Sequence, residues 1–121
     1  MKVKIRRVLA LSSMLAVAFT TTAFAASVDM ERGGRAYLNC GTSGELKSVS
    51  GGTIRGNVFD YASLSITTTY DDGSTSTYSS GMDDTDQTHS SGWEWALDYS
   101  SIHKLFTSSE DCYDTVRLSV N

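Results

Sequence analysis

The sequence has no proline, only two cysteines and only two histidines among its 121 residues. Zinc sites usually take three or four His or Cys ligands at short spacing, and neither His-x-x-x-His nor Cys-x-x-Cys occurs. The Gly-x-Ser-x-Gly turn that carries the nucleophile of α/β-hydrolases is also absent. These absences argue against a zinc enzyme, a thioredoxin-like redox protein and an α/β-hydrolase, and no cofactor is expected.

The first 25 residues have the three parts of a secretory signal peptide. Basic residues lie within 2–7, an apolar run follows from Val8 to Phe19, and Ala23-Phe24-Ala25 gives the small-x-small pattern that signal peptidase cleaves. About twelve apolar residues are too few to span a bilayer as a helix. We therefore predict a signal peptide over 1–25 and one mature domain over 26–121 of a bacterial protein. That domain is expected to be secreted or periplasmic, with no membrane insertion after cleavage.

Basic residues are scarce after the predicted signal peptide. Four of the ten basic residues lie within it, so the mature chain keeps six against fourteen acidic ones, a formal charge of −8. Such a surface repels phosphate backbones and anionic lipid, which makes nucleic acid and bare membrane poor candidate partners. Cationic partners, metal ions and neutral glycans stay open, beside the simpler interpretation that the charge keeps a secreted domain soluble.

The mature chain is rich in Ser, Thr and Gly, and its apolar residues alternate with polar ones. Thr, Tyr and Val favour strands, and Gly favours tight turns. The alternation predicts strands over 35–40, 45–50, 53–59, 62–70, 75–79, 93–99 and 113–120. Gly51-Gly52 is predicted as a hairpin turn and Asp72-Gly73 as a type I′ turn. Residues 102–106 fit a single helical turn or, alternatively, a short strand, and 26–32 is interpreted as a polar leader.

These strands predict an all-β fold. Short strands separated by turns every eight to twelve residues are typical of a small antiparallel β-sandwich, here of about seven strands, with a small barrel as the alternative. An exported protein with two cysteines usually pairs them, and the alternation turns both Cys40 and Cys112 inward. We therefore predict one disulfide between the first and last strands, which would stabilise the fold by about 4 kcal/mol.

The longest predicted loop, 81–92, is acidic. Its ionisable side chains are Asp83, Asp84, Asp86 and His89. Oxygen ligands in a flexible loop suit Ca²⁺, but the spacing to Glu94 matches an EF-hand only in length, because the sixth position lacks glycine. We expect no metal site and a solvated loop that contributes to binding, with a looser Ca²⁺ site at the three aspartates as the alternative. The turns at 71–74 and 108–111 are expected to add contacts.

Aromatic residues alternate within the strand predicted over 93–99. Trp93, Trp95 and Tyr99 share a face with Leu97, so we expect them to pack in the core. The alternative is an exposed aromatic platform that stacks against sugar rings. The hydroxyl side chains of 63–69 are expected to form the solvated face of the sandwich.

No residue is assigned a catalytic role. His89 and His103 are expected to be surface or half-buried polar residues, although a Ser-His-Asp triad assembled in space remains an alternative. The sequence therefore predicts a small non-catalytic binding protein that acts outside the cytoplasm, with an extracellular protein or glycan as its partner. The alternatives are a secreted antibacterial or protease-inhibiting effector and a small secreted hydrolase.

Overall fold

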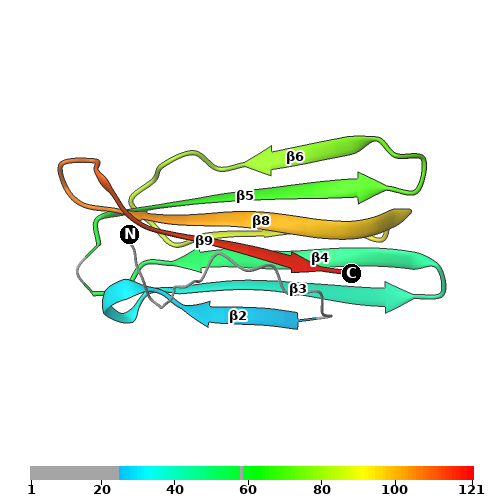
Figure 1. Cartoon of the computed structure of the whole chain (residues 1–121), viewed down its shortest axis with the longest axis horizontal. Coiled ribbons are helices and arrows are strands. Elements are labelled where there is room, and N and C mark those ends of the chain that lie inside the picture. Colours follow the sequence, from blue (N-terminus) through cyan, green and yellow to red (C-terminus); the bar gives the residue numbers. More distant parts are fainter. Residues whose placement is uncertain (1–24, 58) are drawn as a thin grey trace.

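The computed structural model describes residues 25–57 and 59–121. These residues form two antiparallel four-stranded sheets that pack together as a β-sandwich, with the strands along the long axis of the molecule (Figure 1). The predicted all-β fold is therefore confirmed. Residues 1–24 of the predicted signal peptide lie outside the described residues. Within the described part of the chain, no helix is long and apolar enough to cross a membrane.

The first sheet has the strand order β2-β3-β4-β7, and the second sheet has the order β6-β5-β8-β9. The strands of the first sheet are β2 (Ala25–Asp29), β3 (Arg35–Ser43), β4 (Leu46–Ile54) and β7 (Gln87–Ser90). The strands of the second sheet are β5 (Tyr61–Tyr70), β6 (Thr75–Ser79), β8 (Ala96–Phe106) and β9 (Cys112–Val120). A short 3-10 turn, η2 (Glu31–Gly33), connects β2 to β3. Because β4 packs against β8 and β3 against β9, the inner faces of both sheets share one core.

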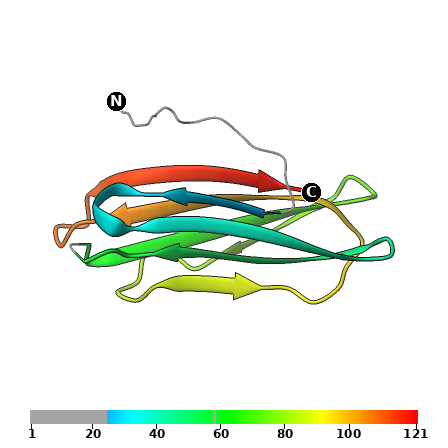
Figure 2. The same cartoon turned by 90° about the horizontal axis from the view of Figure 1, so that it is seen from below.

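The edge strands lie on two opposite sides of the sandwich. Strands β2 and β9 lie beside each other on one side, which we call the β2/β9 side, and β7 lies on the opposite side (Figure 2). Edge strand β6 of the second sheet faces β7 there, because Tyr78 of β6 stacks on His89 of β7. We call this the β6/β7 side.

The β5–β6 hairpin agrees closely with the sequence prediction. Along β5 the buried residues are Ala62, Leu64, Ile66 and Thr68, which alternate with more exposed hydroxyl residues. In the turn, the hydroxyl and amide of Ser74 donate to Asp72 Oδ1 (2.6 and 2.9 Å), which lowers the pKa of that carboxyl. Gly73 alone has a positive φ there (87°), so the predicted type I′ turn, which needs two, is wrong.

Gly51 and Gly52 do not form the predicted hairpin, because both lie inside β4 and are buried. A Cβ at Gly51 would lie 3.0 Å from methyl groups of Leu38 and Ile66 in the core. A Cβ at Gly52 would lie 2.6–2.9 Å from the ring and hydroxyl of Tyr37. Glycine is therefore required here for close packing rather than for a turn. The real turn is at Gly44 and Glu45, which join β3 to β4.

Further segments differ from the sequence prediction. The separate strand predicted over 53–59 is wrong, because 53–54 end β4 and 55–57 are not in a strand, and the strand predicted from Trp93 begins at Ala96. Strand β2 takes in 26–29 of the supposed polar leader together with Ala25, the last residue of the predicted signal peptide, and the predicted long loop contains β7. Residues 102–106 continue β8, so the helical turn is wrong and the strand alternative is confirmed. The described part of the chain thus has eight strands rather than about seven. Strands β2 and β7 were missed because they are short edge strands of five and four residues with one partner each.

The predicted Cys40–Cys112 disulfide is wrong. Both cysteines are free and too far apart to bond, Cys40 buried in β3 and Cys112 exposed at the start of β9. Strands β3 and β9 run in the same direction along the molecule, with Cys40 toward the end of one strand and Cys112 at the beginning of the other (Figure 1). Cys112 lies eight residues, about 26 Å, before Val120 at the strand rise. A disulfide needs Cα atoms within about 7 Å. The expected inward orientation of Cys112 is also wrong, because the register shifts between Leu105 and Phe106 and leaves Cys112 exposed opposite Phe106.

Candidate functional site

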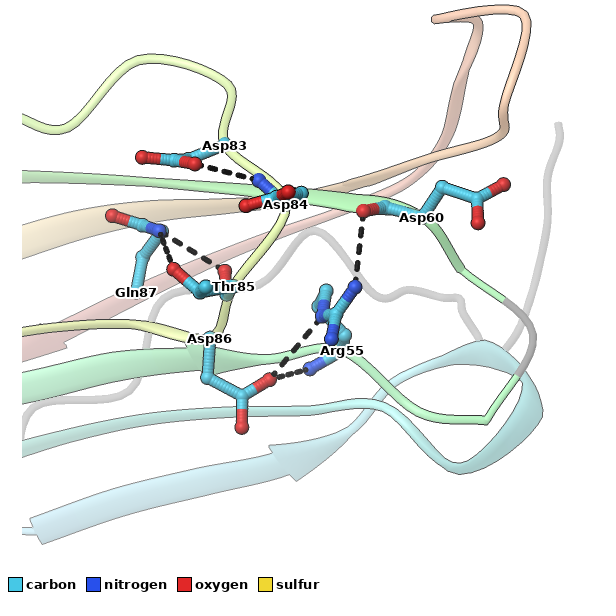
Figure 3. Close-up of polar contacts among 7 residues, drawn as sticks. All are labelled: Arg55, Asp60, Asp83, Asp84, Thr85, Asp86 and Gln87. Carbon is cyan, nitrogen blue, oxygen red and sulfur yellow. Dashed lines mark hydrogen bonds and ion pairs between the residues drawn. The ribbon is translucent and has the colours of Figure 1, made fainter.

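The aspartates of the predicted acidic loop make hydrogen bonds within the loop and to neighbouring segments of the sandwich (Figure 3). Asp83 Oδ1 accepts a hydrogen bond from the next amide, at Asp84 (2.7 Å), and the Asp83 backbone pairs with Ala62 of β5. Asp86 Oδ1 accepts from the Arg55 amide at 2.8 Å and lies 3.8 Å from its Nε. The loop is therefore held to Arg55, which follows β4, and to β5.

These aspartates do not converge on a cation site. In Figure 3 the side chains of Asp83, Asp84 and Asp86 point in different directions, and the third faces Arg55. No group of three or more metal-ligating side chains occurs among residues 25–57 and 59–121. The structure thus gives the Ca²⁺ alternative no geometric support. His89, which the sequence placed in the same loop, belongs to β7, and its ring stacks on that of Tyr78 in β6.

His103 lies in a buried chain of hydrogen bonds between the two sheets. Its Nδ1 is 3.0 Å from Thr53 Oγ1, and its Nε2 is 2.6 Å from Ser101 Oγ. Because the Thr53 hydroxyl donates to the carbonyl of Ser63 (2.8 Å), it must accept from Nδ1–H. The network therefore assigns the Nδ1–H tautomer, with Nε2 accepting from Ser101. The chain links β4 in the first sheet to β8 in the second.

Burial keeps His103 neutral. Desolvation lowers its pKa from an ordinary 6.5 to about 4, although a hydrogen bond to the backbone at Gly52 acts in the opposite direction. A serine beside a neutral histidine resembles part of a hydrolase triad, but His103 is 0% and Ser101 2% exposed. No substrate can contact this pair without opening the core. The residues act as an internal polar bridge, contrary to the expectation that His103 is at or near the surface.

Glu94 lies at the end of the sandwich where the chain crosses from one sheet to the other. Its backbone pairs with Lys47 of β4, whereas Ala96 pairs with Tyr70 of β5. Its carboxylate accepts hydrogen bonds from the hydroxyls of Tyr99 (2.9 Å) and Tyr70 (3.3 Å). Burial raises the pKa of the Tyr99 phenol, and the neighbouring Glu94 carboxylate raises it further. From the sequence, Glu94 was noted only as the last position of a poor match to an EF-hand loop.

A small pocket lies on the β6/β7 side, partly open to solvent and about 110 Å³ in volume. Its lining residues are Val49, Ile66, Thr68, Tyr70, Ser76, Tyr78, His89, Ser91 and Glu94. The Tyr78 and His89 rings that bridge the two sheets are stacked, with centroids 3.9 Å apart and planes at 11°. The pocket combines two apolar side chains, several hydroxyls, an aromatic stack and one carboxylate.

The tryptophans are exposed, so the predicted core packing is wrong. Trp93 and Trp95 are each 56% exposed, and Leu97 is 49% exposed. Tyr99 is 0% exposed and cannot belong to a surface platform with them. The inward–outward alternation changes between Leu97 and Tyr99. Thr69 lies opposite Asp98 and Tyr70 opposite Ala96, which leaves Leu97 as an extra residue in β8.

Trp93 and Tyr37 lie on the outer face of the first sheet, each over a glycine. Trp93 Cη2 and Cζ3 are 3.5 and 3.7 Å from the position that a Cβ of Gly41 would occupy. Tyr37 covers Gly52, its register partner on β4. Because these outward-facing residues alternate with the buried ones of β3, both rings lie on the same face. The sequence analysis did not assign Tyr37 to a site, although glycines inside a strand were the available signal.

Uncharged polar residues separate the two rings. Asn39, Ser50 and Ser90 form one register row across β3, β4 and β7, midway between Tyr37 and Gly41. The rings are separated by four residues of β3, about 13 Å along the strand. Together we call the outward-facing Tyr37, Asn39, Ser50, Ser90 and Trp93 the aromatic face.

The outer face of the second sheet has a different character. As expected, it presents hydroxyl side chains, and one row crosses all four strands through Thr77, Thr67, Ser100 and Ser119. Thr67 and Thr77 hydrogen-bond to each other through their hydroxyls (3.0 Å). Trp95 lies near the β5–β6 turn, since its carbonyl accepts from the Asp71 amide (3.4 Å), and thus sits apart from the Gly41 contact of Trp93.

Comparison of the chain with known protein families, with curated proteins and with solved structures gives no match.

Proposed function

We propose that this protein is a non-catalytic binding protein that acts outside the cytoplasm and holds a neutral glycan on its aromatic face. The observation that carries the proposal is the placement of Tyr37 and Trp93 over Gly52 and Gly41 on one outer sheet face. Trp93 is 56% exposed and Tyr37 is half-buried, so both rings present some surface to solvent. Such aromatic surface stacks well on the apolar faces of sugar rings. A ligand that covers both rings would therefore make stacking contacts at two points along β3.

The polar residues between the rings suit the same ligand. Asn39, Ser50 and Ser90 offer one amide and two hydroxyls, which donate and accept hydrogen bonds as sugar hydroxyls require. No charged side chain lies in that row, which favours an uncharged ligand over an ionic one. The acidity of the predicted mature chain, formally −8, is compatible with a neutral glycan and unfavourable for a polyanion.

The test is retention of the purified protein by a panel of neutral polysaccharides, namely cellulose, chitin, xylan and a β-glucan. Trp93→Ala should weaken binding to the retained polysaccharide at least about tenfold, the typical cost of removing one interface anchor. Tyr37→Phe keeps the ring and should bind within about twofold of the parent, whereas Tyr37→Ala should not.

Trp95→Ala is the matched control, because Trp95 is as exposed as Trp93 but does not lie over Gly41. It should leave binding unchanged. The proposal is overturned if no polysaccharide retains the protein, or if Trp93→Ala and Trp95→Ala weaken binding equally.

A further inference from the structure

The pocket on the β6/β7 side has two chemically different ends. Strand register places the Tyr78–His89 stack beside Ile66 and Gly51 at one end. Four residues farther along β5, about 13 Å at the strand rise, Tyr70 and Glu94 form the other end. The pocket is therefore a trough parallel to the strands, with aromatic rings at one end and a carboxylate at the other.

The lining between the two ends is amphipathic. Val49 extends the apolar wall that Ile66 begins at the aromatic end, and Thr68, Ser76 and Ser91 supply hydroxyls. All five come from strands or strand extensions of both sheets, since Ser91 continues β7 by donating its amide to the Val49 carbonyl (2.9 Å). The site is thus built on the rigid sandwich rather than on a loop.

Glu94 is a half-buried carboxylate without a cation. Its side-chain partners are two phenol hydroxyls, and no Lys, Arg or His nitrogen lies within 4.0 Å of it in the described part of the chain. Two neutral donors replace only part of the hydration that a carboxylate loses on burial. Each carboxylate oxygen keeps a free lone pair, so the group can accept further hydrogen bonds from a ligand.

We propose that this trough binds a protonated primary alkylamine, with the ammonium group at Glu94 and the methylene chain along Val49 and Ile66. The lysine side chain has this form, an apolar stem with a charged head. Hydroxyl oxygens and the carboxylate accept from the three N–H groups, and the aromatic end tolerates a cation or a methylene. The proposal uses none of the aromatic-face residues and goes beyond the glycan-binding function.

The experiment is an NMR titration of the ¹⁵N-labelled protein with butylammonium chloride, and separately with butanol as the uncharged analogue. We expect saturable shifts of the amides of Tyr78, Ser91 and Glu94 with the amine and none with the alcohol. Nα-acetyl-lysine amide and cadaverine, compared at equal ionic strength, distinguish a lysine side chain of a partner protein from a free diamine. Tighter binding of Nα-acetyl-lysine amide would indicate a lysine side chain of a partner protein, and tighter binding of cadaverine would indicate a free diamine.

Glu94→Gln removes the charge but keeps one oxygen to accept from one tyrosine hydroxyl and an NH2 group that can donate to the other, so the fold should persist. It should weaken amine binding at least about tenfold, equivalent to about 1.4 kcal/mol. Asp84→Asn, which removes one charge from an exposed loop residue, is the matched control and should have little effect. Equal shifts with amine and butanol, no saturable shifts at pocket residues, or equal losses in both variants would overturn the proposal.

Discussion

The two sides of this sandwich, where the edge strands of the two sheets face each other, carry different kinds of inward-facing side chains. On the β2/β9 side the inward residues are apolar, namely Ala26 and Val28 of β2 with Val116, Leu118 and Val120 of β9. On the β6/β7 side the inward residues are Ser76, Tyr78, Gln87 and His89, and a pocket remains. Strand order and pairing are alike at both edges, so side-chain choice at a few inward positions decides whether an edge becomes core or site.

The largest expected effect is on the apolar side. Leu118 is 3% exposed, and Leu118→Ala should lower the free energy of unfolding by about 2–5 kcal/mol through lost burial and a cavity. Ser76→Ala on the β6/β7 side should change it by less than about 0.5 kcal/mol. Urea denaturation of both variants measures this. Similar decreases in the free energy of unfolding for the two variants would show that the β6/β7 side is packed as tightly as the β2/β9 side.

A pH dependence should come from His103, which lies between the two sides. Its folded pKa is depressed, so between about pH 6.5 and 4 the unfolded chain binds a proton that the folded chain does not. Its contribution is complete above pH 6.5 and is lost as pH falls through the folded pKa. From pH 7.5 to 4.5 the loss from this residue should be about 2–3 kcal/mol.

Denaturation of the parent and of His103→Gln at both pH values isolates that contribution, because other titrating groups are shared. The variant should lose less stability on acidification, by about the amount given above. An identical loss in both proteins would mean that His103 does not stay neutral in the fold.

The Tyr78–His89 stack should contribute less. It connects the two edge strands of the β6/β7 side, and aromatic pairs add about 0.5–1.5 kcal/mol beyond burial. Tyr78→Ala should therefore cost about 1–2 kcal/mol and change His89 ring resonances in NMR spectra. Thr77→Ala, on the outward position next to it, serves as the control. If His89 resonances do not respond, the rings are not stacked in solution.

The smallest expected effect is that of replacing Cys112, which tests whether a disulfide stabilises the fold. Without a disulfide, Cys112→Ser should change stability by less than about 0.5 kcal/mol, instead of the about 4 kcal/mol expected for a covalent link. In the native protein an aromatic disulfide reagent should titrate one thiol, that of Cys112, because Cys40 is buried and burial raises its pKa. No reactive thiol before reduction would indicate a disulfide.

The sequence predicted the parts of the fold in which local pattern and tertiary context agree. The β5–β6 hairpin was predictable because strict alternation flanks a Gly-containing turn. Gly51 and Gly52 were wrongly predicted as a turn, since their role depends on contacts with Tyr37 and Leu38 from another strand. The extra residue at Leu97 reversed the expected orientation of the tryptophans, and one inserted residue in a strand leaves no local signal.

The sites were less predictable than the fold. Asp83, Asp84 and Asp86 cluster in the sequence and therefore suggested a cation site. A cation site also needs the carboxylates to converge in space, and among the described residues these do not. Tyr37 and Glu94 gained significance only when strand register placed them beside residues far away in the chain. Trp93 was expected in the core and is exposed, whereas Tyr99 is buried, and the outer sheet face that carries Trp93 also carries Tyr37, which the sequence did not indicate.

The central claim is that ligand binding uses the aromatic face of the first sheet. The most direct test is chemical-shift mapping of the ¹⁵N-labelled protein with a soluble oligosaccharide of whichever polysaccharide retains it. We expect perturbations at Tyr37, Asn39, Gly41 and Trp93, with the hydroxyl row of the second sheet unchanged. Perturbations confined to Thr67, Thr77 and their neighbours on the second sheet would contradict it.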